Sequence, residues 1–292
     1  MANLHGNTDR HTSEDMPLDI NQAQSSDSIL ETRSLTRDFG QMRAVDNVNL
    51  DVKAGEVFGL LGPNGAGKST TIKMLTTLLP PSTGSAAIAG LDVVRQASLI
   101  RRVIGYVPQA LSADGSLTGY ENLLIFSKLY DIPRKHREPR IWDVLEFMGL
   151  QDAAHRLVRQ YSGGMIRRLE VAQAMLHQPQ VLFLDEPTVG LDPLARSYVW
   201  ALVKQLRAEY GTTIILTTHF LEEADSLCDR VAIMQAGKVV VTGIPSELKA
   251  SLNRENTTLD DVFIHYTGDQ ITTGGTNYRE VSRTRRTARR LG

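Results

Sequence analysis

The chain has 292 residues, of which 41% are hydrophobic, and its 32 basic and 33 acidic residues give a formal net charge of −1. This size and composition suit one large or two small globular domains, and the near-zero charge excludes the overall basic field that a nucleic-acid coat protein carries. With Cys228 as its single cysteine, the sequence excludes an internal disulfide framework and a zinc site built on paired cysteines, so it suits a reducing cytosol.

The first 28 residues are polar and rich in Asn, Asp, Ser and Gln. They contain no apolar stretch of the roughly 7 to 15 residues that a secretory signal needs, so we expect a disordered N-terminal tail. No other apolar run approaches the roughly 18 residues that span a bilayer. The chain is therefore not expected to form a membrane pore by itself.

Two strands are predicted next, at residues 29–36 and 44–52, and the second alternates apolar and polar side chains. We expect them to form an antiparallel β-layer. A buried strand at 57–61 follows, and after a glycine-rich loop the pattern turns helical at 71–75.

The loop between this strand and helix, GPNGAGKST, fits the phosphate-binding template G-x-x-x-x-G-K-[ST]. Its backbone N–H groups and the helix N-terminus can face a polyphosphate, and Lys68 adds a charge between the outer phosphates. The Ser69 hydroxyl can hold Mg²⁺. An ordinary glycine-rich turn is the alternative, which the flanking strand and helix disfavour. The loop residues expected to bind nucleotide are Gly62, Pro63, Asn64, Gly65, Ala66, Gly67, Lys68, Ser69 and Thr70.

Short strands are predicted at 86–89 and 103–107, after a turn at 80–84. Pro108 ends the second strand and Gln109 follows it. Polar residues are common at strand ends, so Gln109 by itself is ambiguous. Between residues 117 and 177 the apolar spacing becomes helical, which predicts an inserted helical subdomain at about 111–178.

The segment YSGGM inside this region places Ser162, Gly163 and Gly164 at the start of a helix. Ser162 is a good N-cap, and the two glycines leave N–H groups that could bind a phosphate. Capping alone and phosphate binding both remain open from the residues.

The next strand, at 181–184, delivers Asp185 and Glu186 to its carboxyl end, where open α/β sheets hold ligands. Adjacent strand residues point to opposite faces, so we expect different tasks for the two carboxylates. Asp185 would hold Mg²⁺, and Glu186 would polarise the water that attacks the γ-phosphate. A charged turn with no such task is the alternative.

A helix near 194–210 leads to a strand at 213–217, which is expected beside the strand of Asp185 and is followed by His219. His219 is either a structural residue or one that reaches the γ-phosphate. A hairpin of 231–234 and 238–242 completes the predicted core.

Taken in order, the motifs GPNGAGKST, GYVPQ, YSGGM, LFLDEPT, GLDP and TTHF resemble those of an ABC transporter ATP-binding subunit over about residues 29–268. The resemblance implies an α/β fold with a P-loop NTPase core and parallel sheet, an N-terminal antiparallel β-layer and the inserted helical subdomain. It also implies that the cofactors are ATP and Mg²⁺.

The same resemblance implies roles for single residues. Phe39 would stack on adenine, and Asp192 would communicate between paired cassettes. Gln109 would sense Mg²⁺ and the γ-phosphate, His219 would be the switch histidine, and Glu186 the catalytic base. Ser162 to Gly164 would contact the phosphates of a second subunit.

The signature segment departs from the commoner pattern at Met165, where Gln is usual, and at Tyr161, where Leu is frequent. Together with Arg167 and Arg168 and the segment LDDVFIHYTG at 259–268, it is similar to the daunorubicin-resistance subfamily, which implies export. The implied partners are an integral membrane permease and a second ATP-binding subunit, in a head-to-tail homodimer on the cytoplasmic face of the cell membrane, with no nucleic acid.

Three alternatives are weighed against export. An importer subunit would carry the same nucleotide chemistry. A soluble ATPase switch usually has two fused cassettes, and a chromosome-maintenance ATPase separates its motifs by a long coiled coil, whereas this chain has one loop and one signature close together. The transported substrate is not encoded in these motifs.

Residues 269–292 carry six arginines against two acidic residues. We expect a basic flexible tail that is solvated. Attraction to anionic lipid or to a membrane partner is the alternative.

Overall fold

The computed structural model of the protein describes residues 28–268, 272–273 and 276–277. The two expected tails, at 1–28 and 269–292, lie almost entirely outside these described residues.

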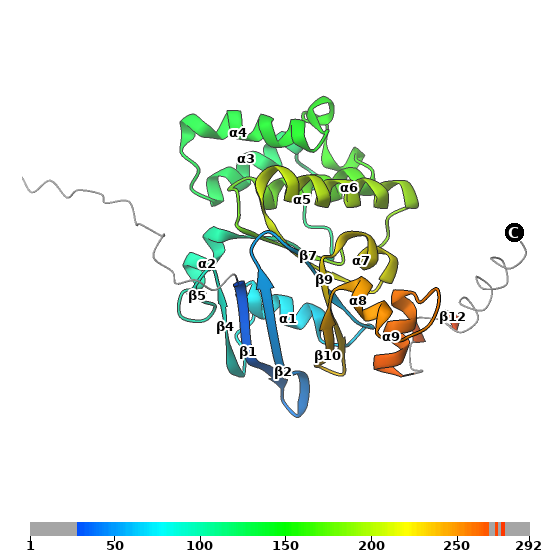
Figure 1. Cartoon of the computed structure of the whole chain (residues 1–292). Helices are drawn as coiled ribbons and strands as arrows, with labels where there is room; N and C mark the ends of the chain where they lie inside the picture. The colour runs from blue at the N-terminus through cyan, green and yellow to red at the C-terminus, as the bar shows by residue number, and fades with distance from the viewer. Residues whose placement is uncertain (1–27, 269–271, 274–275, 278–292) are drawn as a thin grey trace, which may run out of the picture.

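The centre of the molecule is a sheet in the order β10-β9-β3-β8-β7-β6 (Figure 1). Neighbouring strands from β9 to β6 are parallel, and β10 pairs antiparallel with β9. This confirms the predicted parallel core with a hairpin at its edge. The strands are β3 (Val57–Leu61), β6 (Ile104–Val107), β7 (Val181–Asp185), β8 (Thr213–Thr218), β9 (Arg230–Gln235) and β10 (Lys238–Gly243).

Both faces of this sheet are buried, which explains why its strands are continuous apolar runs. Along β3, Val57 and Leu61 join one apolar cluster, whereas Phe58 and Leu60 join the other. The alternation follows from the period of two residues in a strand. The central sheet is therefore the wall between two cores.

A second sheet, in the order β2-β1-β4-β5, is antiparallel throughout. Its strands are β1 (Ser28–Phe39), β2 (Met42–Lys53), β4 (Thr83–Ile88) and β5 (Leu91–Asp92). It shares one core with α1 (Lys68–Leu75) and one face of the central sheet. The predicted β-layer is confirmed, and it also includes the segment that was expected to start at residue 86.

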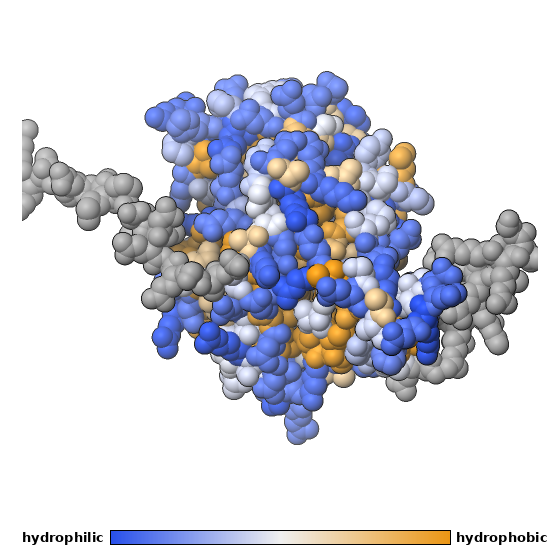
Figure 2. Space-filling view, in the orientation of Figure 1, coloured by the Kyte–Doolittle hydropathy of each residue, from blue (hydrophilic) through white to orange (hydrophobic). Residues whose placement is uncertain are grey.

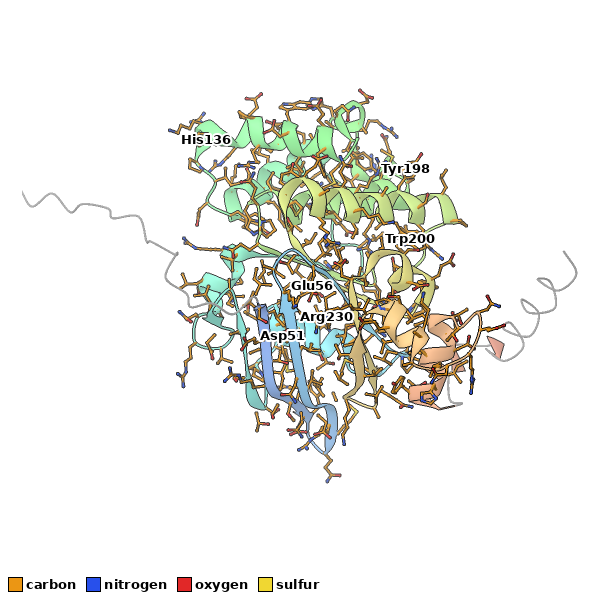
Figure 3. The ribbon with its side chains drawn as sticks, viewed as in Figure 1. Asp51, Glu56, His136, Tyr198, Trp200 and Arg230 are labelled. Atoms are coloured by element: carbon orange, nitrogen blue, oxygen red, sulfur yellow. The ribbon has the colours of Figure 1, made fainter. Side chains whose placement is uncertain are left out.

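Arg230, at the start of β9, ties the two sheets together (Figure 3). Its guanidinium lies 3.2 Å from the Glu56 carboxylate and donates a hydrogen bond to the Asp51 carbonyl. The same group lies 5.7 Å from the centre of the Phe58 ring. These contacts fix the edge of the β-layer against the central sheet.

The helical region lies above the central sheet in Figure 1. It contains α3 (Gly119–Leu129), α4 (Arg134–Phe147) and α5 (Gly163–Met175), with 3-10 turns at Gln151–Ala153 and Val158–Gln160. These elements fall within the interval expected for the helical subdomain. Their apolar side chains form one cluster with the upper face of the sheet, so the region is packed directly on the core.

The remaining helices contribute buried side chains to the two cores. They are α2 (Ala97–Val103), α6 (Pro193–Tyr210), α7 (Leu221–Leu227), α8 (Pro245–Ala250) and α9 (Leu259–Thr267). Four of them, α2, α7, α8 and α9, were not predicted, because helices of only 6 to 9 residues show little periodicity. The strand expected at 103–107 starts at Ile104, since Val103 ends α2.

Past α9, the short strands β11 (Thr272–Thr273) and β12 (Thr276–Asn277) pair antiparallel. The face of the molecule seen in Figure 2 is mostly hydrophilic, with smaller apolar areas between polar ones. Within the part of the chain that the structure describes, no helix combines the length and the apolar character that a membrane crossing requires.

Candidate functional site

The glycine-rich loop joins β3 to α1, and its glycines are required by close backbone contacts. A Cβ on Gly67 would lie 2.6 Å from the Ala44 carbonyl oxygen of β2, and Gly67 has a φ of +104°. A Cβ on Gly62 would lie 2.5 Å from the Met234 carbonyl oxygen. The loop is therefore pressed against β2 and β9, which leaves no room for a side chain at either position.

The α1 helix begins at Lys68 with no side-chain cap and no acidic residue in its first turn. The N–H groups of a helix N-terminus have no partner within the helix, so these groups suit an anion. Pro63, Asn64, Gly65 and Ala66 lie in the loop, and Thr70 lies in the first turn of the helix. The uncapped N-terminus of α1 therefore suits the binding of a polyphosphate.

The Lys68 ammonium lies inside the loop and is only 4% exposed. It donates hydrogen bonds to the carbonyl oxygens of Gly62 at 2.8 Å and Pro63 at 3.2 Å, and it lies 3.4 Å from a carboxylate oxygen of Glu186. Burial lowers the pKa of Lys68, and the Glu186 carboxylate opposes this effect. The cation is held in place by oxygen atoms that a phosphate could replace.

Asp185 ends β7 directly beside the loop. One oxygen of its carboxylate accepts hydrogen bonds from the Ser69 hydroxyl at 3.1 Å and from the Thr217 hydroxyl at 2.5 Å. A serine hydroxyl next to a carboxylate is a set of hard oxygen donors that suits Mg²⁺. Since residues 28–268 contain no group of three or more His, Cys, Asp or Glu that could hold a metal, the remaining ligands would be water and phosphate oxygens.

Glu186 is the first residue after β7, and its φ of +49° lies in the left-handed region. Its carboxylate lies near the Lys68 ammonium, accepts a hydrogen bond from the Gln109 side-chain amide at 3.1 Å, and lies 3.3 Å from Nδ1 of His219. The contact with His219, followed by Lys68, holds the pKa of Glu186 below its ordinary value, against the opposite effect of burial.

The strand alternation predicted opposite faces for the two carboxylates, but both lie at the phosphate loop. The physical reason is that β7 ends at Asp185 and the left-handed turn at Glu186 redirects the chain, so the strand period no longer applies. The pairing of β7 with β8 confirms that the strands of Asp185 and His219 are neighbours.

Other predicted residues lie apart from this group. The Phe39 ring, at the end of β1, is 43% exposed, and the Arg37 guanidinium lies 4.7 Å from its centre. Asp192 caps α6 by accepting a hydrogen bond from the Ala195 N–H.

Ser162 caps α5 by accepting from the Met165 N–H at 3.3 Å, which confirms the capping prediction. A Cβ on Gly164 would lie 3.0 Å from the Ala195 Cβ, and one on Gly163 would lie 3.5 Å from the Leu191 side chain. The start of α5 therefore lies against the start of α6, and Ser162, Gly163 and Asp192 are at least partly exposed. Among the described residues, no hydrogen bond or ion pair joins Ser162 to the phosphate loop.

Two features of the site were not predicted from the sequence. Thr217 holds both carboxylate residues: its hydroxyl donates to Asp185 and accepts from the Glu186 N–H. Arg167 on α5 donates to the backbone carbonyls of Pro108 and Gln109. Thr217 is the first residue of TTHF, and a threonine near a strand end is only a weak signal of such a role. The contact of Arg167 joins residues too distant in sequence to be predicted.

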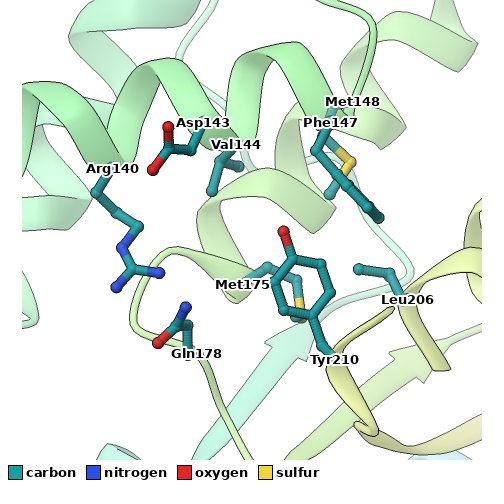
Figure 4. A pocket seen from close by; sticks show the side chains of 9 residues that line it. All are labelled: Arg140, Asp143, Val144, Phe147, Met148, Met175, Gln178, Leu206 and Tyr210. Atoms are coloured by element: carbon teal, nitrogen blue, oxygen red, sulfur yellow. The ribbon is translucent and has the colours of Figure 1, made fainter. Parts of the chain in front are cut away.

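A cavity of about 210 Å³ lies elsewhere, between α4, α5 and α6 (Figure 4). None of the residues of the predicted site lines it. Its lining consists of Arg140, Asp143, Val144, Phe147, Met148, Met175, Gln178, Leu206 and Tyr210.

A family profile described as "ABC transporter" matches residues 45–189. The daunorubicin/doxorubicin resistance ATP-binding protein DrrA of Streptomyces peucetius is 47% identical over 223 residues, which are 76% of this chain and 67% of that protein. The daunorubicin resistance ATP-binding protein DrrA3 of Streptomyces coeruleorubidus is 44% identical over 225 residues, 77% of this chain and 71% of that protein.

A solved structure with a similar fold is that of cbiO1 from Clostridium perfringens, described as part of the ABC transporter complex cbiONQ. It matches with a TM-score of 0.72 and 30% identity, over 78% of this chain and 92% of that chain.

Proposed function

The chain belongs to the ABC transporter ATP-binding family, and from this premise we propose that it powers the export of a drug-like or lipid-like compound through a separate membrane permease. Members of this family are ATPases coupled to transport. The relatives reported above are resistance proteins for daunorubicin, and their names support export over import.

The convergence of Lys68, Gln109 and His219 on the Glu186 carboxylate carries the proposal for hydrolysis. These residues come from four separate segments, and no packing requirement explains why an amide, an imidazole and an ammonium should meet one carboxylate. Such a buried group of titratable residues at the end of parallel strands is typical of a catalytic site.

In the proposed reaction, ATP binds with its phosphates on the loop amides and on Lys68. Mg²⁺, held by Ser69 and Asp185 with Gln109 nearby, would neutralise charge on the phosphate oxygens. Glu186 would accept the proton of the attacking water, because its carboxylate lies beside Lys68, where the phosphates would bind. His219, whose Nδ1 lies 3.3 Å from the carboxylate, would orient it.

We propose that the second half of the site comes from another copy of the chain. The exposed residues Ser162 and Gly163 and the cap Asp192 form a surface of their own, which no described contact joins to the loop of the same chain. A head-to-tail dimer would place this surface against the phosphates bound by the other subunit, and a two-fold axis would give two ATP sites. Phe39 would then stack on the adenine.

The proposed location is the cytoplasmic face of the cell membrane, where the chain would bind a permease. The similarity to cbiO1, which is part of a larger transporter complex, supports a partner of this kind. No role for nucleic acid is proposed, in keeping with the net charge of −1.

The test is to tag the chain, extract the membranes gently, identify the proteins that co-purify and measure ATP hydrolysis with and without them. A multi-helix membrane protein that raises the hydrolysis rate is the expected result. A chain that stays without a membrane partner, or that responds to ribosomes instead, would contradict the transport function.

Direction is tested with the complex in inside-out vesicles, with daunorubicin as the probe and Glu186→Gln as the matched control. ATP-dependent accumulation that the variant lacks would support export. Accumulation only in right-side-out vesicles with ATP enclosed would support the importer alternative.

A further inference from the structure

The α5 helix carries a buried cation that contacts the segment of Gln109. Arg167 is 2% exposed, and its Nη1 donates a hydrogen bond to the Pro108 carbonyl at 2.8 Å while its Nη2 donates to the Gln109 carbonyl at 3.0 Å. One planar guanidinium thus holds two successive peptide groups, which fixes their orientation as well as their position.

Glu170, one turn later on α5, holds the other end of the same segment. Its carboxylate lies 3.0 Å from Nη1 of Arg167, and its second oxygen accepts hydrogen bonds from the N–H of Ser112 at 2.5 Å and from the Ser112 hydroxyl at 3.2 Å. We call Arg167, Glu170 and residues 108–112 the α5 clamp.

Burying such an ion pair is a poor way to gain stability, because the loss of hydration offsets much of the attraction between the charges. Burial lowers the pKa of Arg167, and the carboxylates of Glu170 and Asp185 oppose this effect. Two apolar side chains of similar volume would fill the same space without this loss of hydration. The charged pair is therefore better explained by the geometry that it gives to the segment of Gln109 than by stability.

The clamp links the two functional surfaces of the chain. Ser162 and Gly163, at the start of α5, would contact the nucleotide of a second subunit. Gln109, in the segment that the clamp holds, donates a hydrogen bond from its side-chain amide to Glu186 at 3.1 Å. Arg167 is only one turn from the start of the helix. Arg167 is therefore a contact through which a change in the orientation of α5 can reach the backbone of Gln109.

We infer that Arg167 and Glu170 are positioning residues that hold Gln109 against Glu186 and so make hydrolysis depend on the orientation of α5. This inference rests on the proposed function for the roles of Gln109, Glu186 and the start of α5. The clamp is a contact within one subunit through which the surface of Ser162 and Gly163 would act on Glu186.

The main variant is the double replacement Arg167→Met with Glu170→Leu. It replaces the charged pair with apolar residues of similar size, which buried positions tolerate, so the chain should still fold. Arg167→Lys is a second variant, which keeps the charge but cannot contact both carbonyls with one planar group.

Arg168→Met is the matched control. Arg168 lies on the same helix and also donates to two backbone carbonyls, but these belong to Met148 and Gly149 at the end of α4. This variant removes a contact between α5 and the end of α4 but leaves the hydrogen bonds of Arg167 and Glu170 to residues 108–112 in place.

The first measurement is hydrogen exchange of a peptide that contains Ser112, followed by mass spectrometry. We expect exchange of residues 109–112 to be at least about tenfold faster in the double variant than in Arg168→Met, since the Ser112 N–H loses its acceptor. Unchanged exchange would overturn the clamp.

The second measurement is steady-state hydrolysis by the full chain as a function of ATP and Mg²⁺. We expect kcat of the double variant and of Arg167→Lys to fall about tenfold, with KM for ATP changed less than about twofold, because Gln109 is misplaced while Lys68 and the loop are intact. A kcat equal to that of Arg168→Met would overturn the inference.

If the wild-type chain hydrolyses no ATP, alone or with its membrane partner, the proposed function fails. The clamp is then judged by exchange alone: faster exchange supports the hold on residues 108–112, and unchanged exchange refutes it.

Discussion

The ammonium nitrogen of Lys68 lies 3.4 Å from a carboxylate oxygen of Glu186, and the two side chains are only 4% and 5% exposed. The residue proposed to bind the phosphates and the residue proposed to activate water therefore neutralise each other directly. In the proposed mechanism, a phosphate bound at Lys68 would replace Glu186 as the anionic partner of the ammonium and free that carboxylate to activate water. This one contact would then link ATP binding to hydrolysis.

Replacing Lys68 with Ala should weaken ATP binding by at least about tenfold, because the loop loses its only buried cation while the amides remain. The measurement is equilibrium binding of ATP with Mg²⁺. Lys73→Ala is the control, since Lys73 is an exposed cation on the same helix. Equal affinities for the two variants would contradict the assignment of Lys68.

Replacing Glu186 with Gln should lower kcat by about 10²- to 10⁴-fold, since a general base contributes this much. ATP binding should persist, and the variant should be trapped as an ATP-bound dimer. Size-exclusion chromatography with ATP measures this, with the exposed Glu222→Gln as the control. A variant that elutes only as a monomer would count against the dimer.

The lowered pKa of Glu186 predicts how stability depends on pH. The folded state favours the carboxylate, so its contribution is complete above the ordinary pKa of 4.5 and is lost as the pH falls through the lower folded pKa. We expect the difference in unfolding free energy between wild type and Glu186→Gln to be constant near neutral pH and to decrease below about pH 4.5. Denaturant unfolding over this range checks it, and a difference that does not vary with pH would refute it.

A packing relationship explains Tyr161, one of the two departures in the signature segment. Its hydroxyl donates to the Ala153 carbonyl at 2.6 Å, and a Cβ on Gly119 would overlap that hydroxyl. We therefore expect Gly119→Ala to destabilise the chain by about 1–3 kcal/mol. In a Tyr161→Leu background the same change should be near neutral, because the overlap is gone and Ala favours a helix.

Urea unfolding of the two single variants and the double variant measures this coupling. Gly115→Ala is the control, because its Cβ would lie no closer than 3.6 Å to Arg159. Additive effects of Gly119→Ala and Tyr161→Leu would contradict the packing argument.

The glycine-rich loop and the carboxylates after β7 could be singled out from the sequence because each belongs to a local pattern: a strand that ends at polar residues, or glycines before a lysine. The sequence placed both Asp185 and Glu186 at the carboxyl end of one strand, but it could not predict that a left-handed residue directly after β7 would end the strand alternation there. The contacts of Arg167 with residues 108–109 were also out of reach. They join segments about 60 residues apart, and a charged residue in a helical pattern is usually a solvated one.

Because Glu186 has a left-handed backbone, thermal stability and the proposed catalysis make opposite demands on the residue at this position. A residue other than glycine costs about 1–3 kcal/mol in this conformation, so a screen that rewards only heat resistance would favour glycine there and select an inactive enzyme. Ala236, in the turn between β9 and β10, has a φ of +47° and no part in the chemistry. Replacing Ala236 with glycine would relieve strain at that turn and so raise thermal stability without changing Glu186, the residue proposed as the catalytic base.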